Sequence, residues 1–234
     1  MNYLYIDFET TGLDTKHCAP IEIAAIPVIH GERLEPFVSN IKPFVGSQVS
    51  KEALDVSKKN LTEIYSYEDQ SIVFKRFNEW LNQFDTMFCI KAYNSEFDEA
   101  FLLNWFTRNN SHSDYINKFY PGSKCILKEA RRKIKIKSYK LGNVCKHLNV
   151  ELTNAHSALN DIAASLKVDE LLQGMDKSIE NDIKMNYKQK RSKYLGNDMV
   201  TFGNDGSIFI NDKCTRNPNA LRFVLEEIYN RFVE

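Results

Sequence analysis

Hydrophobic and polar positions follow two different periods along the first 172 residues. Apolar runs over 3–8, 21–29 and 34–41 are rich in β-branched and aromatic residues and are separated by turn residues, as in strands. The second and third runs flank His30-Gly31-Glu32, so we expect an antiparallel meander of three strands. Two more strands are predicted over 86–92 and 123–127.

Between these strands, apolar residues recur every three to four positions, which is the period of an amphipathic helix. The clearest case is 68–84, and further helices are expected near 50–59, from residue 95, and over 139–148 and 157–172. Strands followed by strand–helix alternation predict an α/β domain with a mixed five-stranded sheet flanked by helices.

The pattern changes after residue 172. Residues 174–196 are polar and charged and indicate a helix or a linker. The segment 200–210 predicts a β-hairpin, because Asn204-Asp205-Gly206 suits a type I turn that ends in a glycine bulge. A last amphipathic helix is expected over 219–232. We therefore divide the chain into a domain of residues 1–172 and a C-terminal appendage of residues 173–234, made of a charged segment, a β-hairpin and a helix.

Composition narrows the classes of partner. Lysines and arginines number 31 and aspartates and glutamates 31, so only a local patch can attract nucleic acid. The five cysteines form no C-x-x-C pair, which argues against zinc and disulfide frameworks and favours a reducing, cytoplasmic setting. Neither a signal peptide nor an apolar stretch long enough to span a bilayer is visible, so we expect no membrane partner.

Two carboxylates mark the end of the first predicted strand. Residues two apart in a strand point to the same side, so Asp7 and Glu9 direct both carboxylates to one place. A solvated strand end would have the same pattern. Gly12, shortly after, permits a tight turn through which a ligand can approach the backbone.

Three later residues add acid–base and ligand chemistry. Ser95-x-x-Asp98 has the form of a capping box at the start of a helix, where open α/β sheets place their sites, although a plain helix cap is the alternative. His156 and Asp161 would lie about 140° apart on a helix, so both reach one site only if His156 precedes the helix. A histidine there suits general base catalysis, and a surface or capping histidine is the alternative.

These residues resemble three motifs of one family, in the order that the family has them. The segments are Asp7-Phe8-Glu9-Thr10-Thr11-Gly12-Leu13, Asn94-x-x-Phe97-Asp98 and His156-x-x-x-x-Asp161. They resemble the motifs of the DEDD exonuclease superfamily, and the histidine five residues before the last aspartate resembles its DEDDh branch. That branch includes the proofreading epsilon subunit of DNA polymerase III, RNase T and the TREX exonucleases. The resemblance covers residues 1–172.

The resemblance implies an RNase H-like fold and 3′→5′ hydrolysis of nucleic acid by two metal ions. Four oxygen ligands without cysteine suit hard cations such as Mg²⁺ or Mn²⁺. By the same resemblance Asp7 would bridge both ions, Glu9 and Asp161 would complete one site, and Asp98 would serve the other. His156 would deprotonate the attacking water. The terminal nucleotide would be seated by Thr10, Thr11, Gly12 and Leu13, and Asn94 and Phe97 would line the cleft.

A basic stretch supplies the local charge that the whole chain lacks. Between Lys124 and Lys146 stand nine basic residues and one acidic residue. Lysines alternate with isoleucines over 133–137, so these lysines share a face if the segment is extended. We interpret the stretch as a patch for the phosphate backbone, with a solvated charged face as the alternative. The predicted phosphate contacts are Arg131, Arg132, Lys133, Lys135 and Lys137.

The sequence thus predicts a metal-dependent 3′→5′ exonuclease that degrades single-stranded DNA or frayed 3′ ends to nucleoside monophosphates. An RNA 3′-exonuclease with the same site is the first alternative, and DNA is favoured over RNA as the partner. The second alternative is a non-catalytic binding module associated with a polymerase. In either case the appendage offers a surface for a protein partner or for dimerisation.

Overall fold

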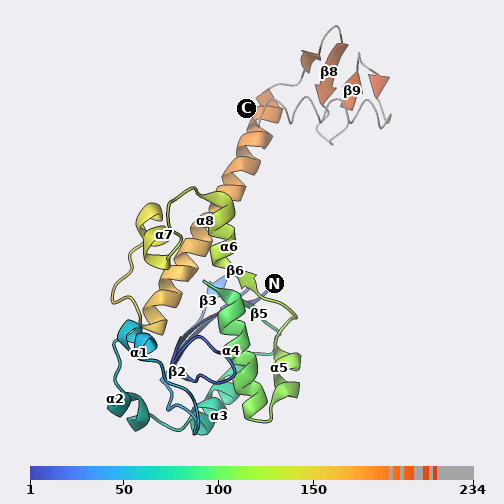
Figure 1. Cartoon of the computed structure of the whole chain (residues 1–234). Helices are drawn as coiled ribbons and strands as arrows, with labels where there is room; N and C mark the ends of the chain where they lie inside the picture. Colours follow the sequence, from blue (N-terminus) through green and yellow to red (C-terminus); the bar gives the residue numbers. More distant parts are fainter. Residues whose placement is uncertain (190–191, 196–197, 203–207, 211–212, 215–234) are drawn as a thin grey trace. The chain divides into compact units, whose positions relative to one another are not determined.

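The computed structural model describes residues 1–189, 192–195, 198–202, 208–210 and 213–214, and the side chains of residues 1–175. The chain divides into two compact units, Met1–Gln173 and Gly174–Glu234. The strands of the first unit are β1 (Tyr3–Thr10), β2 (Pro20–Ile29), β3 (Glu32–Arg33), β4 (Phe37–Asn40), β5 (Cys89–Ala92) and β6 (Lys124–Cys125) (Figure 1). Its helices are α1 (Lys51–Ser57), α2 (Leu61–Ser66), α3 (Gln70–Leu81), α4 (Ser95–Arg108), α5 (His112–Lys118), α6 (Ile126–Lys133), α7 (Leu141–Leu148) and α8 (Ala158–Gln189), which continues into the second unit.

The strands of the first unit form one mixed sheet. They lie in the order β3-β2-β1-β5-β6, and β4 also pairs with β2. β1 runs antiparallel to β2 and parallel to β5, and β5 runs parallel to β6. The α/β class and the mixed sheet are confirmed, but the sheet has six strands where the sequence predicted five.

One face of the sheet packs on an aromatic core. From β1, Leu4, Ile6 and Phe8 point into this core and are at most 5% exposed. Phe8 contacts Trp105 of α4 edge-on, with ring centroids 6.2 Å apart. The face is closed by α3 and α4, whose apolar sides are buried together with β1 and β5. The amphipathic period that predicted these two helices therefore reflects their burial against the sheet.

The opposite face of β1 carries polar side chains and faces α8. Successive residues of a strand point to opposite sides, so Tyr5 and Asp7 lie here. The Tyr5 hydroxyl donates a hydrogen bond to Asp169 of α8 (2.6 Å), and the buried Lys91 ammonium of β5 pairs with the same carboxylate (2.6 Å). This buried ion pair joins α8 to the sheet at Asp169, eight residues beyond Asp161.

Several predicted elements differ from the structure in their bounds. The third strand, expected over 34–41, is shortened to β4, which begins directly after Pro36, a residue that lacks a backbone N–H and is poorly tolerated inside a sheet. The two-residue β3 precedes the predicted range. The fifth predicted strand, 123–127, is only the two-residue β6, because α6 already begins at Ile126. The short helices α2, α5 and α6 were not predicted. None of them has the length over which a helical period stands out.

The second unit contains the predicted hairpin. Its strands are β7 (Ser192–Leu195), β8 (Asp198–Phe202), β9 (Ile208–Ile210) and β10 (Lys213–Cys214). β8 and β9 pair antiparallel with Phe202 opposite Ile208, as the hairpin over 200–210 requires. The turn at 204–206 and the helix predicted over 219–232 lie outside the described residues. The charged segment after residue 172 is helical through Gln189, as part of α8.

Among the residues described, no helix combines the length and the apolar character needed to cross a bilayer.

Candidate active site

Asp7 and Glu9 lie on the polar face of β1, near the end of the strand. Both side chains are partly buried. β5 pairs with β1 only over Tyr3–Tyr5, so the last residues of β1 have no strand partner on that side. This leaves the backbone beside Asp7 and Glu9 open to contacts from the helix that follows β5.

Asp98 makes such a contact. It is 4% exposed, and its Oδ1 accepts a hydrogen bond from the backbone N–H of Phe8 at 3.1 Å. The predicted capping box is wrong, since Asn94 is the N-cap of α4 and no side chain caps that helix. Asp98 therefore satisfies a backbone N–H of the neighbouring strand β1. This bond brings the Asp98 carboxylate to the backbone of β1 at the residue between Asp7 and Glu9.

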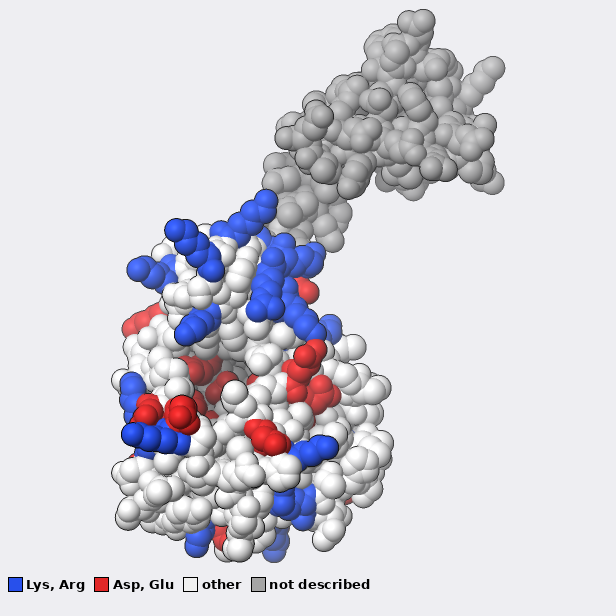
Figure 2. Space-filling view, viewed as in Figure 1, with Lys and Arg blue, Asp and Glu red and all other residues white. Residues whose placement is uncertain are grey.

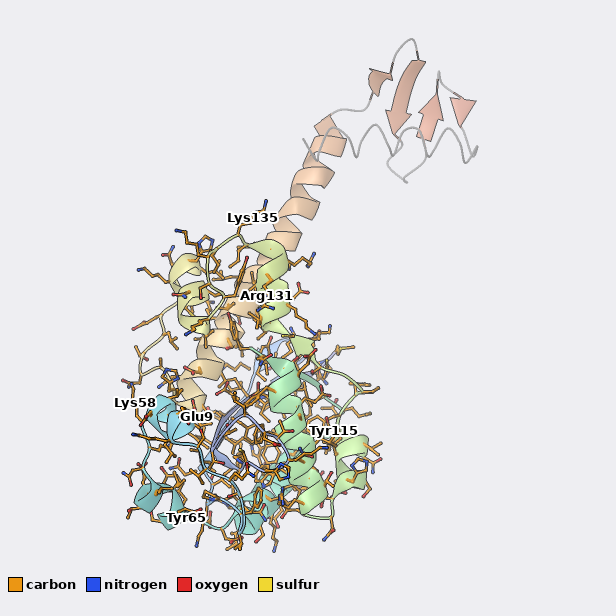
Figure 3. The ribbon with its side chains drawn as sticks, viewed as in Figure 1. Glu9, Lys58, Tyr65, Tyr115, Arg131 and Lys135 are labelled. Atoms are coloured by element: carbon orange, nitrogen blue, oxygen red, sulfur yellow. The ribbon has the colours of Figure 1, made fainter. Side chains whose placement is uncertain are left out.

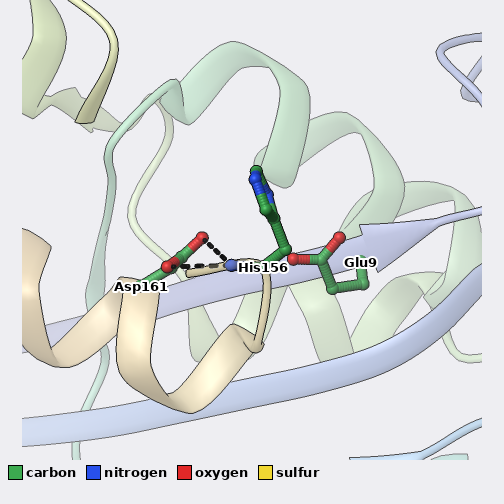
Figure 4. A group of neighbouring side chains, drawn as sticks. All are labelled: Glu9, His156 and Asp161. Atoms are coloured by element: carbon green, nitrogen blue, oxygen red, sulfur yellow. Dashed lines mark hydrogen bonds between the residues drawn. The ribbon is translucent and has the colours of Figure 1, made fainter. Parts of the chain in front are cut away.

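His156 and Asp161 meet as the sequence required. α8 begins at Ala158, and His156 lies on the loop before it with a left-handed backbone, φ 74°. The backbone N–H of His156 lies 3.3 and 3.4 Å from the two Oδ atoms of Asp161. Figure 4 shows the imidazole rising between the carboxylates of Asp161 and Glu9. One possible ligand atom from each of these three residues lies within 4.8 Å of the others.

The carboxylates repel one another and are poorly solvated. Burial, followed by the charges of Asp98, Glu9, Asp161 and Glu22, raises the pKa of Asp7 well above its usual range. Burial and the neighbouring charges of Asp161 and Glu22 raise the pKa of Glu9 to about 7. Burial is also the main cause that raises the pKa of Asp98 to about 7 and that of Asp161 above its ordinary value. The ionised cluster is therefore unfavourable without a counter-charge.

This arrangement fits divalent cations. Carboxylate oxygens prefer hard cations such as Mg²⁺, and a cation would neutralise the repulsion that raises these pKa values. Figure 2 shows acidic side chains inside a hollow on one face of the domain, with lysines and arginines gathered along its rim. The residues that would hold the ions are Asp7, Glu9, Asp98 and Asp161.

The raised pKa values predict an effect of pH on stability. The folded protein holds these protons more tightly than the unfolded chain, in which aspartate and glutamate titrate near pH 4. Without metal, stability should therefore be greatest below about pH 4 as far as these groups are concerned. It should fall as pH rises through the value of about 7 for Glu9 and Asp98. Thermal denaturation in EDTA between pH 5 and 8 measures this effect.

Saturating Mg²⁺ provides the control for this prediction. It should raise the melting temperature at pH 7.5 and make it nearly independent of pH, because the bound cation favours the ionised form. A melting temperature that is equally flat with EDTA and with Mg²⁺ would contradict the electrostatic account of the cluster.

The segment that follows β1 uses its hydroxyls internally. Thr10 Oγ1 donates to the Gly12 carbonyl at 2.8 Å. Thr11 is 0% exposed, donates to the Gln48 carbonyl at 2.6 Å and accepts from the Ala19 N–H at 2.8 Å. Thr11 therefore joins the end of β1 to two neighbouring loops. Its side chain can support a nucleotide seat, but it has no free surface for the nucleotide.

Gly12 and Leu13 differ from these threonines. A Cβ on Gly12 would lie 2.6 Å from Cys18 Sγ, so glycine is required by a close side chain and not by a left-handed backbone. Leu13 is 85% exposed, although it is a large apolar residue. Of the four residues predicted to seat a nucleotide, Leu13 alone combines an apolar side chain with free surface, as a contact with a base requires.

The two predicted cleft residues lie at the start of α4. Asn94 is exposed at the N-cap position. Phe97 is partly buried and packs on Phe101, with ring centroids 4.9 Å apart. Asn94 is therefore accessible to a ligand, whereas Phe97 mainly continues the aromatic core towards the surface.

The five predicted phosphate contacts have different surroundings. Arg131 and Arg132 are exposed on α6, where Arg132 pairs with Glu129 at 2.9 Å. Lys133 is not part of an extended face, because it is the last residue of α6. Its side chain is 6% exposed, and its ammonium donates to the Leu172 carbonyl at 2.7 Å. Lys135 and Lys137 are exposed on the segment after α6, and Figure 3 shows Arg131 on this helix and Lys135 beyond its end.

Sequence reasoning missed two charged residues at the site. Glu22 of β2 lies opposite Glu9 of β1 and forms an ion pair with Lys59 at 2.8 Å. The signal for Glu22 was available, because it is a lone charge in the apolar run Ile21–Ile29. Lys59 follows α1 and had no such signal.

The chain matches a known exonuclease family and resembles proteins of known sequence and structure. The sequence profile of the exonuclease family RNase T matches residues 4–168. The DNA polymerase III PolC-type of Oceanobacillus iheyensis is 27% identical over 186 residues, which make up 79% of this chain and 12% of that protein. The PolC-type polymerase of Thermotoga maritima is 29% identical over 167 residues, 71% of this chain and 11% of that protein. This chain therefore spans only a small part of these relatives.

Solved structures with the same fold include Exonuclease I of E. coli. Its complex with a dT13 oligonucleotide has a TM-score of 0.65 at 21% identity, covering 77% of this chain and 42% of that chain. A complex named ExoI/SSB-Ct has a TM-score of 0.63 at 18% identity, covering 80% of this chain and 44% of that chain. At such identities the likeness establishes the fold.

Proposed function

The chain belongs to the RNase T exonuclease family, and we propose that it is a metal-dependent 3′→5′ exonuclease that releases nucleoside monophosphates from single-stranded DNA or frayed 3′ ends. The observation that carries the proposal is the meeting of four carboxylates and one histidine in one cluster. The intact acidic set argues against a module that only binds.

The names of the similar proteins support DNA as the substrate. The PolC-type relatives are DNA polymerases, and Exonuclease I was crystallised with oligodeoxynucleotides. Because this chain spans only 12% of the first PolC-type relative, the activity of the whole polymerase does not transfer to it. An RNA substrate is the alternative that the experiment below distinguishes.

Each residue of the site has a proposed task. Asp7, Glu9, Asp98 and Asp161 would hold divalent cations, which when bound stabilise negative charge on the scissile phosphate and make water more acidic. His156, on its loop beside Asp161, accepts the proton of the attacking water. Leu13 packs against the terminal base, and the buried Thr11 keeps the segment that carries Leu13 in place.

The test compares four labelled substrates with the full chain. Linear single-stranded DNA with Mg²⁺ should yield mononucleotides from its 3′ end, whereas the same DNA closed into a circle should be resistant. Excess EDTA should stop the reaction. A matched RNA tests whether the enzyme accepts ribose in place of deoxyribose. Linear DNA that ends in a 3′-phosphate should resist, because it lacks a free 3′-hydroxyl. Rapid cutting of the circle would indicate an endonuclease, and faster release from RNA would favour the alternative.

The exposed part of the basic stretch should hold the strand behind the 3′ end. We define the basic rim as Arg131, Lys135 and Lys137, which are exposed and lie on or just after α6. Replacing all three by alanine should flatten the salt dependence of binding by about two units, at about 0.7 per phosphate contact on a single strand. The KM should rise more than kcat falls, because these contacts exist equally in the ground and transition states.

A matched control removes the same number of charges elsewhere. Lys75 and Arg76 of α3 and Lys167 of α8 are basic residues outside α6 and the segment after it, each paired with a glutamate on the surface. Their triple alanine variant should keep the wild-type salt slope. Equal slopes for the basic rim variant and the wild type would assign the rim to a solvated face.

The partner of the C-terminal appendage stays a prediction. An ExoI/SSB-Ct complex exists for a protein with the same fold, which supports the general idea that such nucleases bind other proteins. We propose that residues 173–234 bind a protein partner or a second copy of the chain. Size measurement of the full chain by sedimentation decides whether it dimerises.

A further inference from the structure

A fifth carboxylate lies beside the proposed metal ligands and has no part in the mechanism above. Glu22 of β2 is directly opposite Glu9 of β1 in the antiparallel register. Like charges in this position destabilise a sheet pair. The Glu22 side chain is only 10% exposed, so water does not screen this repulsion well. Such a residue needs compensating contacts.

Both oxygens of Glu22 have a specific partner. Oε2 lies 2.8 Å from the ammonium of Lys59, whose side chain is 12% exposed. Oε1 accepts a hydrogen bond from the backbone N–H of Ala158 at 3.0 Å. Ala158 is the first residue of α8, and the N–H groups of a first helical turn have no partner within the helix. Glu22 therefore caps α8 from a neighbouring strand.

The capped turn carries the chemistry of the third motif. Asp161 lies in the first turn of α8, and its N–H donates to the Ser157 carbonyl at 3.0 Å. His156 lies two residues before Ala158 and is tied to Asp161 through its own N–H. A displacement of Ala158 would thus move both the Asp161 carboxylate and the loop of His156 relative to Glu9.

We propose that Glu22 is a positioning residue of the metal site, which fixes the first turn of α8 against β1 through Ala158 while Lys59 balances its charge. The inference rests on the proposed function, because it treats Asp161 as a metal ligand. Reach is the property that matters: the carboxylate must extend from β2 to the N–H of Ala158. The charge of Glu22 is secondary, since Lys59 already neutralises it.

Two substitutions separate reach from charge. Glu22→Gln keeps the length and an oxygen that accepts from Ala158, but it loses the charge. Glu22→Asp keeps the charge but is shorter by one methylene and does not reach. The affinity of the full chain for Mn²⁺ is measured by electron paramagnetic resonance without substrate. It should be about 10–100-fold weaker in Glu22→Asp and close to wild type in Glu22→Gln.

The control breaks the buried ion pair that joins α8 to the sheet about two turns beyond Asp161, so it weakens the attachment of the helix without touching its first turn. Lys91→Met removes the partner of Asp169 and should lower the melting temperature while Mn²⁺ affinity stays at the wild-type value. A comparable loss of Mn²⁺ affinity in Lys91→Met would overturn the proposal, because any damage to the sheet would then have the same effect. The proposal also fails if Glu22→Gln binds Mn²⁺ as weakly as Glu22→Asp, or if neither variant differs from wild type.

A second measurement does not depend on the folding of Glu22→Asp. In the metal-free wild type and in Glu22→Gln, the Ala158 amide should be protected from hydrogen exchange, because its N–H is bonded to residue 22. Exchange of this amide at the rate of an exposed one would overturn the proposal. Neither measurement uses nucleic acid, so a failure here is distinct from a lack of exonuclease activity.

Discussion

Replacing Asp7 by asparagine should abolish nuclease activity and at the same time stabilise the metal-free protein. Burial is the largest cause that raises the pKa of Asp7, and the charges of four neighbouring carboxylates raise it further: Asp98, Glu9, Asp161 and Glu22. Asp7 therefore lies at the electrostatic centre of the cluster. Bound cations supply several kcal/mol of transition-state stabilisation, and about 1.4 kcal/mol corresponds to tenfold in rate. We expect turnover to fall by at least about 10³-fold.

The gain in stability has the same cause as the loss of activity. Asparagine has nearly the shape of aspartate but no charge, so the repulsion between residue 7 and four other carboxylates disappears. The melting temperature in EDTA at pH 7.5 should rise by about 2–4 °C for each kcal/mol of relieved repulsion. Added Mg²⁺ should no longer raise it much. These outcomes are measured by calorimetry and by mononucleotide release.

Asp85→Asn is the matched control for Asp7→Asn. Asp85 is an exposed carboxylate between α3 and β5, and its replacement should change neither turnover nor the response of the melting temperature to Mg²⁺. An Asp7→Asn variant that keeps wild-type turnover, or that becomes less stable in EDTA, would contradict the central position of Asp7.

Replacing His156 by alanine should lower turnover by about 10²–10⁴-fold, which is the usual contribution of general acid–base catalysis. The imidazole is exposed on the loop before α8, next to Asp161 and Glu9, where a water could reach both the histidine and the site. Higher pH should partly rescue the variant, because hydroxide then replaces the water that His156 would activate. Single-turnover rates between pH 6 and 9 measure this.

Metal binding distinguishes the base from a ligand. The ring of His156 is close enough to Glu9 and Asp161 to ligate an ion with them. If His156 is the base, His156→Ala should bind Mn²⁺ with nearly the wild-type affinity. A large loss of Mn²⁺ affinity without rescue at high pH would make His156 a ligand instead. His112→Ala, which removes an exposed histidine at the start of α5, should leave both properties unchanged.

The sequence by itself determined the features that depend on neighbouring residues. The two-residue period located β1 and placed Asp7 and Glu9 on one side of it, because strand geometry leaves no other arrangement. The five-residue spacing of His156 and Asp161 required a loop before the helix, and α8 begins at Ala158. Pro36 was also visible, and its missing N–H was reason enough to begin the third predicted strand after it, where β4 begins.

Only the tertiary structure decided which partner each polar group has. Asp98 had a plausible partner in its own helix, but it accepts from Phe8, 90 residues away. Lys133 belonged to a basic stretch by sequence, yet its ammonium is buried against Leu172. Glu22 reaches Ala158 across 136 positions of the chain. A buried polar group must find a partner somewhere, but local sequence does not show which distant group the fold will bring within hydrogen-bond distance.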